Sequence, residues 1–271
     1  MKQKILVLLD GTPKSLSFQH ELLMNSHKWN SNFDVTFAYV SPLLENCEIV
    51  YSSNELNNNQ YTYLEIVDKA FSDNLNIDNA ILFATKMMLQ VNELKILMIS
   101  DEKVLSDTAK GFDMVLFRQT CFGCKIREWA MNHLLSIGLP FYITTDFNIN
   151  EVKESYFLFT GSDDNTKAIK QYIYLFDKSI EHQMIHLISI VNPSGMQHEK
   201  VIYDYIRSRF NKVMVQRLYI EDTPSFYKKI LSKGKEHSIV THKNHTDFVN
   251  YFSHKSKALG DDVLANVFIS Q

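Results

Sequence analysis

The first residues that could form a binding site are Asp10, Gly11 and Thr12, which directly follow an apolar run. That run, Ile5 to Leu9, is too short to span a membrane and does not alternate, so it predicts a strand buried on both faces. Gly11 permits a tight turn, and Thr12 can cap a helix that begins at Pro13. A carboxylate at such a turn can contact a ligand or support the helix N-terminus, and both interpretations stay open for Asp10.

The second half of the chain repeats this arrangement with Thr160, Gly161 and Ser162, again directly after an apolar run. Gly161 lies 150 residues after its counterpart in the first half. Pro42 and Pro193 each close a later predicted strand, and they are 151 residues apart. Two landmarks of different kind at nearly the same offset predict an internal duplication.

Cys121 and Cys124 have the spacing of half a redox or metal site. We expect them near the start of a helix, where a thiolate is stabilised. A structural zinc site needs four ligands and only two are local, and the surroundings of a thioredoxin-like motif are missing. Two ordinary thiols are therefore the favoured interpretation, and a thiol-based sensor is the alternative.

Four histidines, His237, His242, His245 and His254, lie close together in the second half. His242 and His245 have the spacing of ligands on one helical turn, but no cysteine pair or acidic signature completes a site. We expect a polar loop that covers the sheet edge here, and no metal site.

The sequence also excludes several classes of function. It contains no nucleophile elbow, zinc-protease helix or P-loop, so an enzyme is not expected. With 28 basic and 31 acidic side chains the net charge is −3, which disfavours nucleic acid as a partner. No apolar run approaches the roughly 18 residues of a membrane span, and Met1 leads almost directly into a strand, so neither a membrane segment nor a signal peptide is expected. Three cysteines in 271 residues fit a reducing, cytoplasmic location.

Apolar periodicity predicts strands that alternate with helices along the whole chain. After the first strand we expect further strands in the first half at Phe33–Val40, Leu94–Ile99, Phe112–Phe117 and Phe141–Thr145. The expected strands of the second half are Tyr156–Thr160, Ile185–Val191, Val213–Ile220, His237–Thr241 and Leu264–Ser270. A shorter and less regular helix is expected within 246–262. The duplication predicts two domains, 1–147 and 153–271, joined by a linker at 148–152.

In this order the elements resemble the universal stress proteins in their tandem two-domain form. The resemblance rests on Ile5 to Thr12, on its echo at Tyr156 to Ser162, and on the strand ends at Val40 and Val191, each followed two residues later by proline. It implies an α/β fold of two tandem Rossmann-like domains, of the adenine nucleotide alpha hydrolase-like type. Each would be a five-stranded parallel sheet flanked by helices, with ligands bound at the carboxyl ends of its first and fourth strands.

Nucleotide-binding members of that family carry an aspartate after the first strand and a glycine motif after the fourth, whose backbone amides hold phosphates. Asp10 matches the first feature. Near the second feature the chain has only Gly123, with no second glycine at the needed spacing. In the second half Thr160 replaces the aspartate, and no glycine follows the fourth strand before Gly260. The resemblance therefore implies the fold but argues against the phosphate site in both halves.

No cofactor is expected, and the alternative is ATP or AMP in the crevice of the first half, with slow ATP hydrolysis as the one enzymatic possibility. The resemblance names the residues that would hold such a nucleotide: Asp10, Gly11, Thr12, Val40 and Gly123. Their equivalents in the second half are Thr160, Gly161, Ser162 and Val191.

The resemblance also implies how the chain meets its partners. The fifth strands, Phe141–Thr145 and Leu264–Ser270, would lie near each other in an intrachain pseudo-dimer, as the family pairs them. Covering such edges is physically expected, because an unpaired apolar edge invites aggregation. A homodimer stays open. The function implied is that of a stress-response binding or adaptor protein without ATP, with a protein partner that the sequence does not identify.

Overall fold

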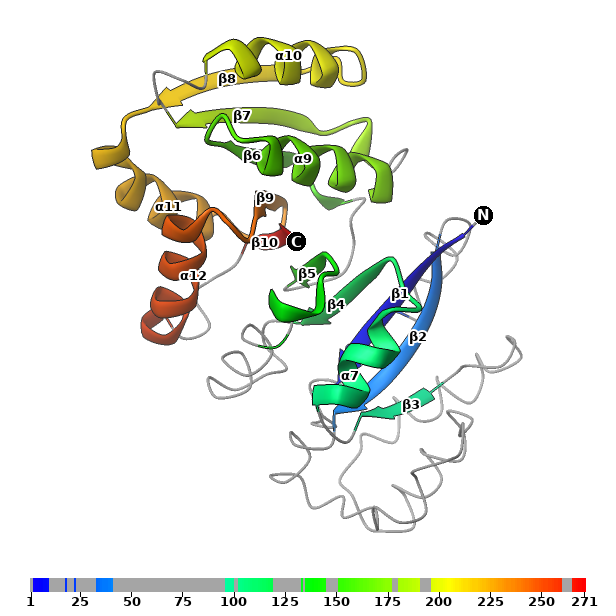
Figure 1. The fold of residues 1–271 in the computed structure, drawn as a ribbon. Helices are drawn as coiled ribbons and strands as arrows, with labels where there is room; N and C mark the ends of the chain where they lie inside the picture. The colour runs from blue at the N-terminus through cyan, green and yellow to red at the C-terminus, as the bar shows by residue number, and fades with distance from the viewer. Residues whose placement is uncertain are drawn as a thin grey trace. The chain divides into compact units, whose positions relative to one another are not determined.

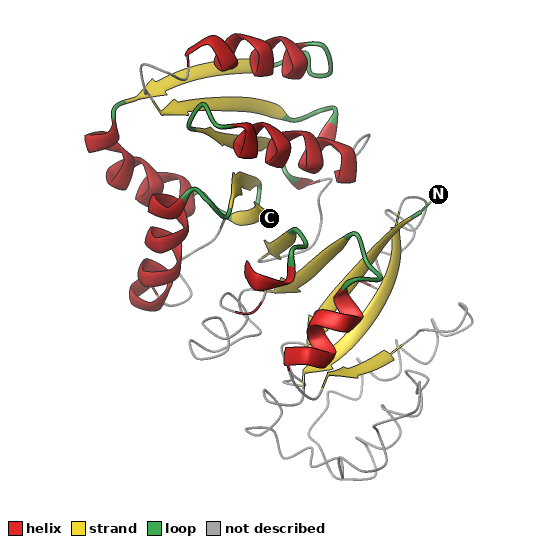
Figure 2. Cartoon of the chain, viewed as in Figure 1, coloured by secondary structure: helices red, strands yellow, loops and turns green. Residues whose placement is uncertain are grey.

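The computed structural model describes residues 2–9, 18, 22, 33–40, 96–99, 102–118, 133, 135–144, 151–176, 180–190, 196–259 and 265–271 (Figure 1). The chain divides into two compact units, Met1–Arg127 and Glu128–Gln271. From residue 154 onward the described strands and helices alternate, and nearly all described strand pairs of the chain are parallel (Figure 2). The predicted α/β class is confirmed.

Unit 1 is built around its first strand, as the apolar run predicted. Its strands are β1 (Gln3–Leu9), β2 (Phe33–Val40), β3 (Ile96–Ile99) and β4 (Met114–Arg118), and its described helix is α7 (Glu102–Ala109). The strands are parallel in the order β3-β2-β1-β4. Residues Ile5 to Leu9 are all buried, which agrees with a strand covered on both faces.

Unit 2 contains the larger described sheet. Its strands are β5 (Phe141–Thr144), β6 (Glu154–Phe159), β7 (Met184–Ile190), β8 (Val213–Leu218), β9 (His237–His242) and β10 (Asn266–Ser270). Its helices are α9 (Asp163–Phe176), α10 (Met196–Arg207), the 3-10 turn η3 (Ile220–Asp222), α11 (Thr223–Leu231) and α12 (Thr246–Leu259). The strand order is β5-β10-β9-β6-β7-β8, with β5 antiparallel to β10 and the other pairs parallel.

In each unit the strand order changes side at the first strand of the parallel set, so later strands are added on its other edge. β6 pairs with β7 on one side and with β9 on the other, just as β1 pairs with β2 and β4. The helices that follow such neighbouring strands leave toward opposite faces, so a crevice opens at the strands' carboxyl ends. In unit 2 this switch point lies between β6 and β9.

The helix α9 forms because its apolar residues recur every three or four positions. Its buried side chains include Ile169, Tyr172, Ile173 and Phe176, which face the sheet at β9 and β10. Tyr172 meets the ring of Phe268 on β10 edge to face, with centroids 5.3 Å apart. Asp163 and Asp164 in its first turn complement the positive end of the helix dipole.

Three strand or helix boundaries differ from the predicted ones for identifiable reasons. The fourth strand begins at Met114 because Asp113 closes a turn: its carboxylate accepts the backbone N–H of Lys4 at 2.7 Å. β8 ends at Leu218 because the chain enters η3 at Ile220. The prediction of a short, irregular last helix was wrong: α12 has 14 residues and buries Phe248 and its neighbours Val249 and Phe252.

The pairing of β5 places the division between the units earlier than the predicted linker. Phe141, Tyr142 and Ile143 pair with Ile269, Phe268 and Val267 of β10, so this strand belongs to unit 2. Of the predicted linker, Val152 is also buried in unit 2. The domain boundaries 1–147 and 153–271 express a duplication of the sequence and stay a prediction. No helix in the described part of the chain is long and apolar enough to cross a membrane.

A buried polar network connects β5, β6 and β9 beneath α9. The Tyr142 hydroxyl lies 2.8 Å from the Ser238 hydroxyl, and both residues are inaccessible or nearly so. The Ser155 hydroxyl donates to the Gln183 amide oxygen at 2.6 Å and lies 3.3 Å from the Tyr172 hydroxyl. Burial raises the pKa of both tyrosines, so they remain neutral hydrogen-bonding groups.

This network predicts a non-additive mutational response. Ser238→Ala removes the buried hydroxyl that lies 2.8 Å from the Tyr142 hydroxyl and should lower the free energy of unfolding by about 1–3 kcal/mol. Tyr142→Phe on the same background should cost much less than Tyr142→Phe alone, because both polar groups are then gone. Urea unfolding of the two single variants and the double variant measures the coupling. Simple additivity would contradict this assignment.

Candidate functional site

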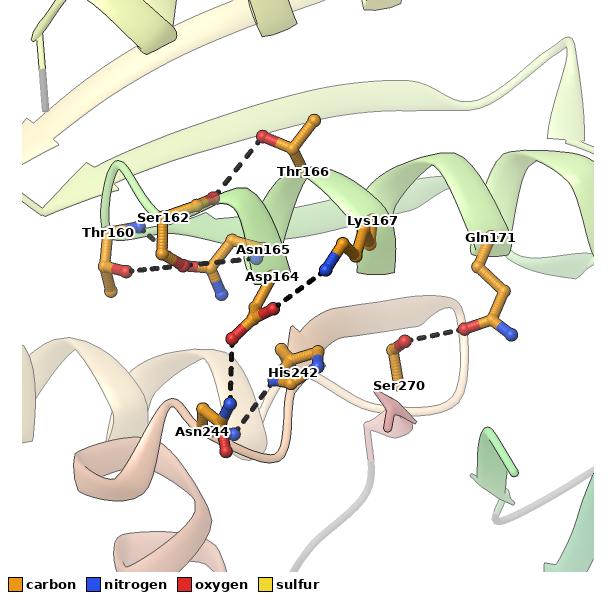
Figure 3. Close-up of polar contacts among 10 residues, drawn as sticks. All are labelled: Thr160, Ser162, Asp164, Asn165, Thr166, Lys167, Gln171, His242, Asn244 and Ser270. Atoms are coloured by element: carbon orange, nitrogen blue, oxygen red, sulfur yellow. Dashed lines mark hydrogen bonds and ion pairs between the residues drawn. The ribbon is translucent and has the colours of Figure 1, made fainter. Parts of the chain in front are cut away.

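The candidate site is the switch point of unit 2, where the turn after β6 and the turn after β9 meet (Figure 3). The first turn carries Thr160, Gly161 and Ser162, the predicted second-half equivalents of a ligand site. The second turn runs from His242 to His245. Because parallel strands end at the same edge, these turns stand beside each other.

The side chain of Asn165 organises the first turn. Its amide oxygen accepts the backbone N–H of Thr160 at 3.0 Å, the Thr160 hydroxyl, and the Ser162 hydroxyl at 2.9 Å. Ser162 is in turn the N-cap of α9, because its hydroxyl oxygen accepts the backbone N–H of Asn165 at 3.2 Å. Asn165 is buried, so its amide group is an internal part of the turn.

Gly161 is the residue that lets the chain leave β6 in this direction. Its φ of 86° lies in the left-handed region, which residues that carry a Cβ rarely adopt. The conformation aims its carbonyl at α10, where Nδ1 of His198 lies 3.1 Å from the carbonyl oxygen and donates to it. Thr160, Gly161 and Ser162 therefore all have partners within the protein.

A hydrogen bond across the switch point connects the second turn to the start of α9. The Asn244 side chain donates to Oδ2 of Asp164 at 2.8 Å, and Lys167 approaches Oδ1 of the same carboxylate at 3.4 Å (Figure 3). The hydrogen bond from Asn244 lowers the pKa of Asp164, burial opposes this shift, and His242 and Lys167 add to the lowering. The backbone N–H of Asn244 is held by Nδ1 of His242 at 3.0 Å. An ionised carboxylate therefore lies between the start of α9 and the turn after β9.

The end of β10 closes a third side. The Ser270 hydroxyl donates to the amide oxygen of Gln171 on α9 at 2.6 Å (Figure 3). The backbone N–H of Lys243 donates to the carbonyl of Ser270 at 2.9 Å. Three strands and one helix thus meet in one hydrogen-bonded junction.

Phosphate recognition at a switch point needs free backbone N–H groups at a helix N-terminus and no competing negative charge. In unit 2 the side chains of Ser162 and Asn165 take backbone donors of that turn, and the carboxylate of Asp164 lies beside them. The junction joins β6, β9 and β10 by polar contacts, but its negative charge and occupied N–H groups disfavour the binding of an anion.

His242 and His245 correct the prediction of a polar loop at the sheet edge. His242 is the last residue of β9, and both side chains are buried. His245 lies between two hydroxyls: Nε2 is 3.0 Å from Tyr227 and Nδ1 is 3.0 Å from Thr241. Burial lowers the pKa of His245 to about 4, so its ring is a neutral hydrogen-bonding group at pH 7.

Most of the predicted first-half site lies outside the described residues: Asp10, Gly11, Thr12, Gly123, Cys121 and Cys124. Val191 of the second half lies outside them too. Val40 is the last residue of β2, at the carboxyl edge of the unit 1 sheet. The thiol hypothesis therefore stays a prediction. Among the residues that the structure describes, no three His, Cys, Asp or Glu side chains are grouped so as to hold a metal ion.

Asp164, Asn165 and Asn244 are the site residues that sequence reasoning missed. One signal was available: Ser162 precedes Asn165 by three residues, the spacing of reciprocal capping at a helix start. The contact between Asp164 and Asn244 spans 80 residues and had no local signal.

Comparison with known proteins supports the fold. No family model matches the sequence, and no curated protein matches it significantly. Solved structures match over nearly the whole chain. A universal stress protein from Archaeoglobus fulgidus is 13% identical, with a TM-score of 0.57 over 99% of this chain and 96% of that one. A putative universal stress protein from Pseudomonas aeruginosa is 9% identical, with a TM-score of 0.51 over 99% and 93%.

The same fold also occurs in a protein of different description. The cytoplasmic domain of a prokaryotic cation chloride cotransporter is 8% identical, with a TM-score of 0.52 over 100% of this chain and 95% of that domain. At such identities the comparisons establish the architecture, and function has to be argued from the site.

The first prediction from this site concerns Asn165. Asn165→Ala removes the acceptor for one backbone N–H and two hydroxyls and should lower the free energy of unfolding by about 1–3 kcal/mol. Asn250→Ala, on an exposed position of α12, is the matched control and should change it by less than about 0.5 kcal/mol. Denaturant unfolding followed by circular dichroism provides the comparison. Equal effects of the two substitutions would contradict the conclusion that Asn165 stabilises the turn after β6.

The second prediction concerns His245 and pH. Its folded pKa of about 4 lies below the ordinary 6.5, so stability from its neutral ring is complete above pH 6.5 and is lost as the pH falls toward 4. The loss should reach about 3 kcal/mol. In His245→Gln this part of the pH dependence should vanish, whereas exposed His182→Gln should retain it. Unfolding free energies at several pH values test this, and a difference between wild type and His245→Gln that is constant with pH would contradict it.

Proposed function

Because the fold matches that of universal stress proteins, we propose that this chain is a cytoplasmic stress-response binding or adaptor protein that works without ATP in unit 2. The observation that carries the proposal is the hydrogen bond between Asp164 and Asn244, which joins the two switch-point turns at 2.8 Å. A nucleotide would have to break this bond and place its phosphates beside an ionised carboxylate. Both steps oppose binding.

The rest of the junction points the same way. Thr160, Gly161 and Ser162 are engaged with Asn165 and His198, so a ligand at this turn would first have to displace internal hydrogen bonds. Displacing internal hydrogen bonds without replacing each of them costs affinity. We therefore propose that unit 2 acts as a binding scaffold.

An adenine nucleotide in the first half is the second candidate. Asp10 directly follows β1, and Leu9 at the end of that strand pairs with Tyr39, next to Val40. The ends of β1 and β2 therefore lie at the same edge of the sheet, which is where such a sheet receives a ligand. Such a nucleotide would use Asp10, Gly11, Thr12, Val40 and Gly123.

We also propose that the two fifth strands form the centre of an intrachain pseudo-dimer. The antiparallel pairing of β5 with β10 supports this proposal, since antiparallel contact of equivalent strands is what a two-fold arrangement generates. The predicted positions Thr145 and Leu264 lie outside the described residues. A partner for the adaptor role would be another protein, with neither nucleic acid nor a membrane involved.

The proposal predicts that ATP does not bind to unit 2. Calorimetric titration of the whole chain with ATP and Mg²⁺ should give no saturable binding at micromolar concentration. If binding occurs, Asp10→Ala should abolish it and Thr160→Val should leave it unchanged, which assigns the nucleotide to the first half. Binding that survives Asp10→Ala and is lost in Thr160→Val would overturn the assignment for unit 2.

Native mass spectrometry of protein freshly isolated from cells complements the titration. The adaptor role predicts the bare chain or the chain with a second protein. A retained adenine nucleotide would favour the second candidate instead.

A further inference from the structure

A cluster of titratable side chains lies at the amino-terminal ends of β6, β7 and β9, the opposite ends from the switch point. We call it the Glu154 cluster: Glu154, Tyr156, His186, Lys233 and His237. The strand register explains how it assembles, because Glu154 lies opposite His237 and Tyr156 lies opposite His186. Side chains two residues apart share a face of a sheet, so these four groups project from the same face.

Four groups of the cluster converge on one oxygen atom. Oε2 of Glu154 accepts the Tyr156 hydroxyl at 2.6 Å. The same oxygen lies 3.4 Å from Nζ of Lys233, 3.4 Å from Nε2 of His186 and 3.5 Å from Nε2 of His237. Three nitrogen groups therefore compete for a carboxylate oxygen that already accepts a hydroxyl.

The Tyr156 ring connects the competing groups physically. It stacks on His186 with centroids 4.6 Å apart and an interplanar angle of 8°. Nζ of Lys233 lies 5.0 Å from the centre of the same ring, close enough for a cation–π contact. A positive charge on His186 would therefore arise against the ring that helps to hold Lys233.

At neutral pH the cluster holds one negative and one positive charge. Burial works to raise the pKa of Glu154, but the hydrogen bond from Tyr156 and the charge of Lys233 outweigh it, and the pKa is lowered. Burial lowers the pKa of His186 and of His237, although Glu154 opposes the shift. Nε2 of His186 and Nδ1 of His237 are buried and have no hydrogen-bond partner within the described structure. Both imidazoles are neutral at pH 7, and protonation would make each of them a counter-ion of Glu154.

Lys233 lies in the turn that joins α11 to β9, where Gly234 has a φ of 100°. Two other ion pairs join this turn to the segment before β6: Lys153 with Glu236 at 2.6 Å, and Lys235 with Glu151 at 3.9 Å. Lys153 lowers the pKa of Glu236, so that pair persists below pH 6. The contact of Lys233 with Glu154 is the one beside the histidines.

We propose that the Glu154 cluster is an acid-sensitive latch for the turn between α11 and β9, which residues 232–236 form. At neutral pH Lys233 is the counter-ion of Glu154 and holds the turn. When the pH falls, His186 and His237 each take a proton from solvent and become the counter-ions. Their side chains are about 15% exposed against 30% for Lys233, so the lysine is the cation that returns to water. No covalent bond changes.

The latch does not depend on whether the chain binds ATP, because it occupies the other end of the sheet. It adds a specific input to a stress-response protein: a fall in pH is converted into release of one surface turn. The exposed lysines in this turn and beside it, Lys235, Lys228 and Lys229, would then present a more mobile basic surface at acid pH.

Nuclear magnetic resonance of the whole chain between pH 7.5 and 5 tests the latch. The ring signals of His186 and His237 should titrate below pH 6.5, and the amide signals of 232–236 should shift with the same midpoint. Each histidine whose pKa is higher in the released form should raise the opening equilibrium of these amides by up to about tenfold per pH unit as the pH falls toward that midpoint. Amides of 232–236 that do not follow the histidine titration would overturn the proposal.

Variants make the test independent of the titration itself. Glu154→Gln removes the anion but keeps the shape, so amides 232–236 should already resemble the acid state at pH 7. The double variant His186→Gln and His237→Gln should lose the pH response, whereas exposed His182→Gln should keep it. An unchanged turn in Glu154→Gln at pH 7, or an unchanged pH response in the double variant, would contradict the latch.

Discussion

The carboxyl edge of unit 2 depends on the buried amide oxygen of Asn165. This oxygen accepts a backbone N–H and two hydroxyls, so it fixes the path of the chain from β6 into α9. Once that path is fixed, Asp164 is aimed at the turn after β9 and can receive Asn244. The contact between Asp164 and Asn244 therefore depends on the path of the turn after β6, and that path depends on the hydrogen bonds of Asn165. The carboxyl edge of such a sheet usually binds ligands, whereas here its polar groups are hydrogen-bonded to one another.

The two ends of β6 therefore have opposite electrostatic character. At its carboxyl end the polar groups are paired by short hydrogen bonds, and the buried His245 stays neutral down to about pH 4. At its amino end one carboxylate is shared among Lys233, His186 and His237 at distances too long for strong hydrogen bonds. The buried ring at the carboxyl end therefore keeps its protonation state between pH 7 and about pH 4. The amino end responds to conditions, and the rigid strand separates the two.

The sequence was informative wherever local pattern decides structure. The bounds of β2 were predicted correctly because Phe33–Val40 is rich in β-branched and aromatic residues and is bounded by asparagine and by Ser-Pro. β1 was recognised because a run without alternation has to be covered on both faces. The α/β class followed from the order of such segments.

Prediction failed where distant residues decide the environment. His245 is polar by type, but the hydroxyls of Tyr227 and Thr241 hydrogen-bond its ring and offset the free-energy cost of burying it. The Asp164–Asn244 contact joins residues 80 positions apart. The Glu154 cluster required the register of β6, β7 and β9, which no local pattern reveals. Residue type identifies candidate groups, and only topology shows which of them share a site.

The position of β10 has a consequence for how the sheet folds. Among the described strands of unit 2, β10 follows all the others in the sequence, yet in the sheet it lies between β5 and β9. Until residues 266–270 dock, the edges of β5 and β9 that they pair with remain open, and open apolar edges are sites of wrong association. Pairing β5 with β10 joins segments more than 120 residues apart in the sequence, which is a slow step in folding. The docking of β10 is therefore the step that commits this sheet to its native strand order.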